Sequence, residues 1–388
     1  MADSNRAQVY YLAEVTWGAT PASALTALRF TGESLKYNIK KDTSKEIRSD
    51  RQITDLIPTG ADAGGGVNGE LSYGTYDSFL AAALWSAGWS TPIAITGTIA
   101  CDGTQNALVS ATETMNTNVH TGQWILISDH SVGTYNVYAL VTAATATHLI
   151  LAGGITLATS AGEACSVSSS GMIRNGTTET SFTLERYHAD VTQYFVYTGM
   201  VVNTFNLNVN SNAVIDLSFD FIGKDETLQQ TSAGTGAASA ANTNEVINVA
   251  THVGSILEGS TLAAINASLF IQKINLTVNN NVRGLDGIGN LANVDIGVGS
   301  CDVSGSMSPY FISETLYDKF VANTATGLSW KMQDTAGNAF IVTLHTVKYK
   351  DDSVNAGGQN SDVPENITFQ ALRNSTYDCT IQIDRFAA

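Results

Sequence analysis

Residues 300–311, SCDVSGSMSPYF, place Asp302, Ser304 and Ser306 at alternate positions, the Asp-x-Ser-x-Ser spacing of metal-dependent adhesion sites. In such sites the motif follows an apolar central strand of a doubly wound sheet, whose strands alternate with helices. The residues before this motif, NVDIGVGSC, alternate between polar and apolar types instead, and helical segments are few. We therefore predict a polar strand ahead of a helix here, rather than a metal site.

Other patterns that could support catalysis or ligand binding are weaker. The stretch GADAGGGVNG lacks the Gly-Lys-Ser/Thr ending of a phosphate-binding loop. Asp216 and Asp220 share one face of a predicted strand, but no pattern around them indicates a pocket that would raise the pKa of either carboxyl group. LDGIGNLANVD, residues 285–295, lacks the alternating acidic ligands of a calcium loop. We predict no enzyme activity, no catalytic residue, no metal and no cofactor.

The histidines and cysteines show no spacing typical of a metal or redox site. The histidines occupy positions 120, 130, 148, 188, 252 and 345. The cysteines occupy positions 101, 165, 301 and 379, and no C-x-x-C pair occurs. We expect four separate buried thiols, because free Cys is among the most buried residue types.

The chain is acidic, with 35 Asp and Glu against 19 Lys and Arg in 388 residues, a net charge of −16. Proteins that grip nucleic acid neutralise phosphates with clustered basic side chains, and this sequence has no basic run. Its 44% share of apolar residues suits a folded globular protein. No apolar stretch approaches membrane-spanning length and no leader pattern opens the sequence, so we expect a soluble protein made in a cytoplasm.

Period-two alternation of polar and apolar residues dominates the sequence. In VIDLSFDF, Ile215, Leu217 and Phe219 point one way, and the acidic and hydroxyl side chains between them point the other. INLTVNNN, TFNLNVN and DCTIQID follow the same rule. Helical spacing is confined to TYDSFLAAALW, with Thr75 as the expected N-cap, and SETLYDKFVANT, with Ser313 as the expected N-cap. The pattern predicts half-buried strands, each with one uncharged or weakly charged polar face.

An internal repeat divides the chain. VNGELSYGTYDSFLAAAL at 67–84 aligns with VSGSMSPYFISETLYDKFVANT at 303–324, so that Tyr76 and Asp77 match Tyr317 and Asp318. SLKYNIKK corresponds to INLTVNNN upstream, and two further strand pairs correspond downstream. Each half therefore predicts a strand, a long loop, a strand, a helix and three more strands.

A Gly-, Ala-, Ser- and Thr-rich block interrupts the first half, and its short β patterns predict an inserted β domain. TSAGTGAASAANTN, residues 231–244, has the composition of a mobile connection. The predicted boundaries are 1–91 and 176–230 for the first unit, 92–175 for the insert, 231–266 for a linker and 267–388 for the second unit.

Several stretches resemble the tail-tube (major tail) proteins of long-tailed, siphovirus-like bacteriophages. The resemblance lies in YYLAEVTWGATP, in SLKYNIKKDTSKEIRSDRQITD running to VNGELSYGTYDSFLAAALW, and in YTGMVVNTFNLNVNSNAVIDLSFDFIGKDE. It implies two tandem β-sandwich or barrel units, each with one flanking helix, beside a small inserted all-β domain. It also implies a virion protein, assembled in the host bacterial cytoplasm, whose stacked rings form a hollow tube that carries DNA into the host.

The resemblance implies partners as well. These are further copies of the chain, a tape measure protein, a tail terminator and distal tail or baseplate proteins; double-stranded DNA would pass through without specific binding, and no membrane is involved. Because one chain holds two similar units, we prefer a ring of three chains over a ring of six.

The strand patterns predict which side chains line such a tube. The residues opposite the apolar faces are the candidates for the lumen: Asp216, Ser218, Asp220, Asn275, Thr277 and Asn279. These wet, non-cationic side chains would let DNA slide rather than stick.

The loop at 40–60 carries most of the local charge, and we interpret it as a contact with the next ring rather than as a free solvated loop. Its candidate contact residues are Lys41, Asp42, Lys45, Glu46, Arg48, Asp50 and Arg51. Two alternative functions stay open, a virion or cell-surface adhesin built of β-domains and, less favoured, a β-sandwich hydrolase.

Overall fold

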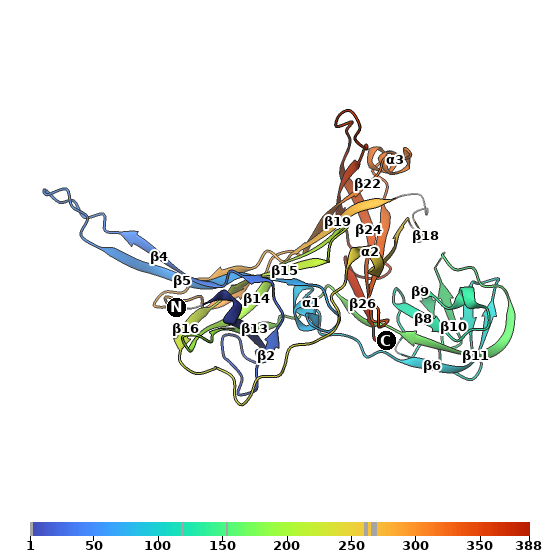
Figure 1. Cartoon of the computed structure of the whole chain (residues 1–388), viewed down its shortest axis with the longest axis horizontal. Helices are drawn as coiled ribbons and strands as arrows, with labels where there is room; N and C mark the ends of the chain where they lie inside the picture. Colours follow the sequence, from blue (N-terminus) through green and yellow to red (C-terminus); the bar gives the residue numbers. More distant parts are fainter. Residues whose placement is uncertain (1–2, 118, 153, 260–262, 265–269) are drawn as a thin grey trace.

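The computed structural model describes residues 3–117, 119–152, 154–259, 263–264 and 270–388. Antiparallel β-strands make up most of this part of the chain, together with the short helices α1 (Asp77–Ala83), α2 (Val249–His252) and α3 (Thr315–Val321). The predicted mainly-β fold is confirmed. A long two-stranded arm projects from one side of the molecule and a small barrel lies on the other (Figure 1).

Seven strands form what we call the first strand set. They are β1 (Ala7–Ala13), β4 (Lys36–Thr43), β5 (Leu56–Glu70), β13 (Ser181–His188), β14 (Gln193–Asn210), β15 (Asp216–Gly223) and β16 (Asp225–Gln229). The first half of β14 lies between β13 and β16, and its second half pairs with β15. β1 continues the sheet beyond β13, and β5 and then β4 continue it beyond β15. The short strands β2 (Thr26–Leu28), β3 (Gly32–Glu33) and β12 (Gly171–Arg174) pair with β1, β5 and β26.

Seven later strands, the second strand set, repeat this pairing order. They are β17 (Val253–Glu258), β19 (Ile271–Asn279), β22 (Asp302–Pro309), β23 (Thr326–Gln333), β24 (Ala339–Val354), β25 (Glu365–Ala371) and β26 (Gln382–Phe386). β24 takes the place of β14, with β23 and β26 beside its first half and β25 beside its second. β17 pairs with β23, and β22 and β19 follow β25. The short strands β18 (Ala263–Ala264), β20 (Arg283–Leu285) and β21 (Asp295–Gly297) complete this half.

Register shifts occur at matched positions in the two strand sets. The β13–β14 pairing shifts between Phe182 and Leu184, and the β23–β24 pairing shifts between Thr326 and Leu328. The β14–β15 pairing shifts after Val202, and the β24–β25 pairing shifts after Tyr349. Matching these shifts makes Phe205 the counterpart of Asp352 and Leu217 the counterpart of Glu365.

A pair of glycines confirms this correspondence. A Cβ on Gly65 would lie 2.3 Å from the carbonyl oxygen of Ser34, and a Cβ on Gly305 would lie 2.3 Å from that of Asn275. Only glycine permits such close approach of two strands. The structure therefore pairs Gly65 with Gly305, four residues away from the alignment that sequence alone suggested.

The same offset corrects the helix alignment. Tyr76 is buried at the start of α1, whereas Tyr317 on α3 is exposed and Leu316 is buried in its place. Both helices lie where the helical spacing predicted them. Their caps differ from prediction, because Tyr76 and Glu314 occupy the N-cap positions without a capping side chain, and the Thr75 hydroxyl instead bonds to Ser72 Oγ at 2.6 Å.

The two strand sets are joined edge to edge. Residues 204–210 of β14 pair antiparallel with 273–279 of β19. This seam produces one continuous sheet in the order β4-β5-β15-β14-β19-β22-β25-β24 (Figure 1). One apolar core runs beneath it and includes Phe205, Phe219, Leu276 and Phe369 from both sides of the seam. The strict alternation in these strands leaves the polar residues on the opposite face of the sheet.

A closed six-stranded barrel interrupts the first strand set in sequence but packs against the second. Its strands are β6 (Ala94–Asp102), β7 (Ala107–Val109), β8 (Trp124–Ser128), β9 (Tyr138–Ala144), β10 (His148–Leu151) and β11 (Ser160–Ser169). Trp124 and Leu140 contact Ile341 and Phe386 of the second strand set. The indole of Trp124 also donates to Thr343 Oγ1 at 2.9 Å.

The stretch predicted as a linker contains regular structure. α2 and β17 lie within 231–266. Ser239 exchanges backbone hydrogen bonds with Leu25 and Ala27, and Ile247 with Leu71 and Ile215, residues that flank or precede the first strand set. Residues 260–262 and 265–266 of this stretch lie outside the described residues. The domain boundaries stay predictions.

Candidate functional site

The six residues predicted to line a lumen lie on one face of the continuous sheet. They form three rows that cross the seam through β14: Asp216, Asn208 and Asn275; Ser218, Asn206 and Thr277; Asp220, Thr204 and Asn279. The residues between them, such as Leu217 and Leu276, are buried in the core. The structure therefore brings together residues from two distant segments, and only the backbone pairing of β14 to both β15 and β19 makes them neighbours.

Hydrogen bonds hold the middle row together. Asn206 donates from Nδ2 to Ser218 Oγ at 3.1 Å and accepts at Oδ1 from Thr277 Oγ1 at 2.8 Å. A side-chain amide can serve both neighbours because it carries donors and an acceptor. Asn206 and Asn208 were not among the predicted site residues, although the alternation in TFNLNVN already placed them on a polar strand face.

The Asp-x-Ser-x-Ser motif extends the same rows onto β22. Ser306, Ser304 and Asp302 lie opposite Asn275, Thr277 and Asn279. Gln370 Nε2 on β25 donates to Asp302 Oδ1 at 2.6 Å. In the part of the chain that the structure describes, no three acidic, Cys or His side chains are placed to hold a metal. The pairing with β19 places the motif on a polar strand face ahead of helix α3.

The predicted contact loop forms the tip of the arm built by β4 and β5 (Figure 1). All seven charged candidates, Lys41, Asp42, Lys45, Glu46, Arg48, Asp50 and Arg51, are exposed there. Arg48 forms a two-point ion pair with Asp50 at 2.6 and 3.0 Å, and this contact lowers the pKa of the Asp50 carboxyl group. Both partners of this ion pair lie within the tip itself.

Apolar side chains on the arm are the feature that sequence reasoning missed. Ile47 is 99% exposed and Ile53 is 72% exposed, and Leu56 and Ile57 are exposed at the base of the tip. Four large aliphatic side chains on one projecting hairpin suggest a surface that is covered in an assembly. The signal was present in sequence as isolated isoleucines among charges, but their exposure depends on the arm standing away from the core.

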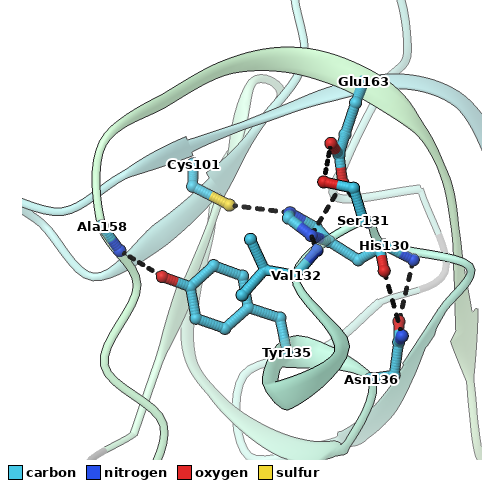
Figure 2. Close-up of polar contacts among 8 residues, drawn as sticks. All are labelled: Cys101, His130, Ser131, Val132, Tyr135, Asn136, Ala158 and Glu163. Atoms are coloured by element: carbon cyan, nitrogen blue, oxygen red, sulfur yellow. Dashed lines mark hydrogen bonds and ion pairs between the residues drawn. The ribbon is translucent and has the colours of Figure 1, made fainter.

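The barrel contains a cysteine, a histidine and a glutamate in a line (Figure 2). His130 Nδ1 lies 2.7 Å from Glu163 Oε1, and His130 Nε2 lies 3.5 Å from Cys101 Sγ. In enzymes with a thiol nucleophile, a histidine likewise contacts the cysteine and a carboxylate orients the histidine. Cys101, however, is 2% exposed, and burial raises the pKa of its thiol, which disfavours the reactive thiolate. The arrangement instead fastens the loop that carries His130 and Tyr135 onto the barrel wall.

The four cysteines are free thiols. Cys101, Cys165 and Cys379 are buried as predicted, whereas Cys301 is only half-buried. No helix in the described residues is long and apolar enough to cross a membrane.

A two-strand-set β protein with a projecting arm and an ordered polar sheet face has the features of a self-assembling structural protein. Comparison with family models bears this out, since the model described as phage tail tube protein matches residues 4–371. The chain therefore belongs to the phage tail tube protein family, whose members are structural proteins of the virion tail. A search of curated proteins finds no match.

Proposed function

We propose that three copies of this chain close into a ring, and that rings stack into a hollow tube through which DNA leaves the virion. The observation that carries this proposal is the continuous eight-stranded sheet, whose polar face is ordered in rows across both strand sets. A sheet that curves and closes on further copies would turn this face into the wall of a channel.

The seam inside the chain provides a template for the contact between chains. In the seam, β14 pairs with β19. The counterpart of β14 is β24, and the counterpart of β19 is the segment 32–38, so these two segments are the ones expected to pair between copies. The counterparts of the seam residues 204–210 are 351–357; of these, residues 351–354 lie on β24 and pair with β25 on one side, and residues 32–38 pair with β5 on one side. Among the described residues, no strand lies along the second side of either segment. Pairing these segments between copies is a head-to-tail contact. Such a contact closes into a ring of three when it rotates each copy by one third of a turn relative to the previous one.

The strand count fits a channel wide enough for DNA. Three chains with eight strands each give twenty-four strands, and a spacing of about 4.8 Å with a tilt of about 40° gives a backbone diameter of about 48 Å. Inward side chains leave room for a hydrated duplex.

The charge of the chain suits transport rather than binding. Three chains carry a formal charge of −48, and the proposed wall offers Asp216, Asp220 and Asp302 among uncharged amides and hydroxyls. Lys36, Lys273 and Lys348 lie on the same face, so the proposal rests on the net charge rather than on an absence of cations: a ring of charge −48 repels phosphates overall. DNA would therefore slide along it.

The arm is proposed to reach the neighbouring ring. It extends away from the sheet body (Figure 1). Its charges are exposed, and its tip presents Ile47 and Ile53 to solvent. Burying these side chains against another ring would stabilise stacking by about 1.5–3 kcal/mol for each fully covered isoleucine. The tape measure, terminator and distal tail proteins are proposed as further partners at the ends of the tube.

Electron microscopy of negatively stained, purified protein tests the function. We expect rings with three-fold symmetry, or long hollow rods. Dispersed protein that binds host cells would favour the adhesin alternative, and turnover of a polysaccharide would favour the hydrolase. Either result without rings or rods contradicts the proposal.

A further inference from the structure

Two carboxyl groups occupy the apolar face of the second strand set, where the first set has apolar side chains. Glu365 is 1% exposed and alternates toward the core with Ile367 and Phe369 on β25. Asp352 on β24 is 8% exposed and lies opposite Ile367. Their counterparts in the first set are Leu217 and Phe205, both buried in the core.

These carboxyl groups lack the donors that buried acids require. Both oxygens of Asp352 and Oε1 of Glu365 are buried, and no described residue donates a hydrogen bond to them. Burying two unpaired carboxylates side by side is strongly unfavourable. A single proton shared between them removes one charge and provides the missing hydrogen bond.

The surrounding groups do not neutralise the pair. Tyr349 donates its hydroxyl hydrogen to Glu258, and Asp351 next to the pair is exposed and acidic. Lys319, the cation contributed by α3, is held by both oxygens of Glu258 at 2.5 and 2.6 Å. Burial, followed by the neighbouring Asp352, raises the pKa of Glu365 to about 8, and burial also raises the pKa of Asp352.

The pair lies on the strand that would meet the next copy. In the seam inside the chain, Phe205 faces Val278. The counterpart of Val278 in the first strand set is Tyr37. Val278 pairs with Val303, and Tyr37 pairs with Ala63. Ala63 and Val303 correspond because they lie two residues before Gly65 and Gly305. Asp352 would therefore face Tyr37 of a second copy.

We propose that Asp352 and Glu365 form a proton-sharing pair that makes the docking of a second copy's residues 35–38 onto β24 depend on protonation. This inference rests on the ring proposed above. With its proton, the pair satisfies its own oxygens beneath the incoming strand; without it, two carboxylates must be buried together. The contact between copies thus responds to pH, whereas the apolar seam inside each chain does not.

The direction of the effect follows from the proton balance. Docking covers what is still exposed of Asp352, 8% of the residue, and replaces the water beside the pair by protein, so the pKa of the pair is higher in the docked state than in the free chain. Above a pH of about 8 the free chain has released this proton, whereas the docked state still holds it. Docking must then take up a proton, so it weakens as the pH rises further. Below that pH both states hold the proton, and docking is insensitive to pH.

The test compares assembly of the full chain at pH 7.5 and pH 9, in EDTA, by sedimentation velocity and negative-stain microscopy. We expect the equilibrium constant of each contact between wild-type copies to fall several-fold between these pH values. The double variant Glu365→Leu/Asp352→Phe, which copies the residues of the first strand set, and the isosteric variant Glu365→Gln should show no such fall. Asp378→Asn, at an exposed acid on the surface, should behave as the wild type.

The outcomes separate this inference from the ring itself. Equal wild-type assembly at both pH values overturns the proton-dependent contact and leaves the ring intact. Loss of assembly at pH 9 in the Glu365→Gln variant, with the fold retained by circular dichroism, also overturns it. Assembly that fails in EDTA and returns with Ca²⁺ or Mg²⁺ shows that a cation, not a proton, holds the pair. Folded protein that assembles at neither pH overturns the ring and this inference together.

Discussion

Individual residues decide how closely the strands of the sheet approach each other. Gly305 stands where β22 crosses close to β19, and Gly65 stands at the matching place in the first strand set. At such a contact a methyl group has no space, so the position admits glycine alone. This requirement explains why the same residue recurs in both halves although most others differ.

Gly305→Ala should therefore destabilise the fold. The added Cβ would meet the Asn275 carbonyl oxygen and the Phe369 ring, and we expect a loss of about 1–3 kcal/mol in the free energy of unfolding, the typical cost of overpacking. Urea unfolding of the purified chain measures it. Gly133→Ala, where no atom lies within 4 Å of the new Cβ, is the matched control. Equal stability of the two variants would contradict the close approach.

Asp384 gives a pH-dependent stability. Its carboxylate lies buried where the barrel meets β26, and accepts from Ser170 Oγ at 2.5 Å and Gln382 Nε2 at 2.6 Å. Burial outweighs these hydrogen bonds and raises the pKa of Asp384 to about 7. Between pH 4 and 7 the folded chain then holds a proton that the unfolded chain releases, so this group makes stability fall as the pH rises.

Asp384→Asn should remove that contribution. We expect the melting temperature of the variant to decline less than that of the wild type between pH 4 and pH 7, as followed by circular dichroism. Asp42→Asn, on the exposed arm, should leave the wild-type slope unchanged. A variant at position 384 with the full wild-type slope would show that other groups control the effect.

Secondary-structure elements that correspond between the two strand sets have different surroundings. α1 buries Phe79, Leu80, Ala82 and Ala83, and the second half of the chain adds two contacts: Arg385 of β26 forms an ion pair with Asp77, and Asn280 donates to the Ala83 carbonyl. α3 has no such cover in the described residues, and Tyr317 and Val321 are exposed. The second half of the chain thus covers part of α1, whereas α3 keeps exposed apolar side chains.

The arm is an element whose role can be separated from folding. Ile47→Ser/Ile53→Ser should leave the chain folded, because neither side chain packs on the core, yet should shorten or abolish rods. Deleting residues 42–54 should have the same effect. Thermal melting checks the fold and negative-stain microscopy measures rod length. Val15→Ser, at a position that is 92% exposed outside the arm, is the control. Rods of normal length from the arm variants would refute the contact between rings.

At the scale of the whole molecule, the charge of the sheet face is predicted to govern DNA passage. Asn275→Lys and Thr277→Lys place cations in the rows that cross the seam. We expect such tubes to assemble but to release DNA several-fold more slowly, because each lysine gives phosphates a counterion site. DNA release from phage carrying the variants measures this. Gln105→Lys on the barrel adds the same charge at an exposed site elsewhere and should have no effect. Unchanged release from the sheet variants would contradict a lumen at this face.

The sequence by itself determined the mainly-β fold, the two helices and the polar strand faces. Alternation is a local property, so VIDLSFDF and INLTVNNN each revealed a face without any knowledge of their neighbours. It also determined that the protein repeats, although it set Val67 against Val303 when the close strand contacts require Gly65 against Gly305.

Only the tertiary structure decided which faces meet. The pairing of β14 with both β15 and β19 joins residues some sixty positions apart into common rows, and strand pairing of this range leaves no mark within either segment. Exposure of Ile47 and burial of Glu365 were likewise undetermined, because the same side chain is core or surface according to what packs over it. Long-range contacts set burial, whereas local spacing sets only periodicity.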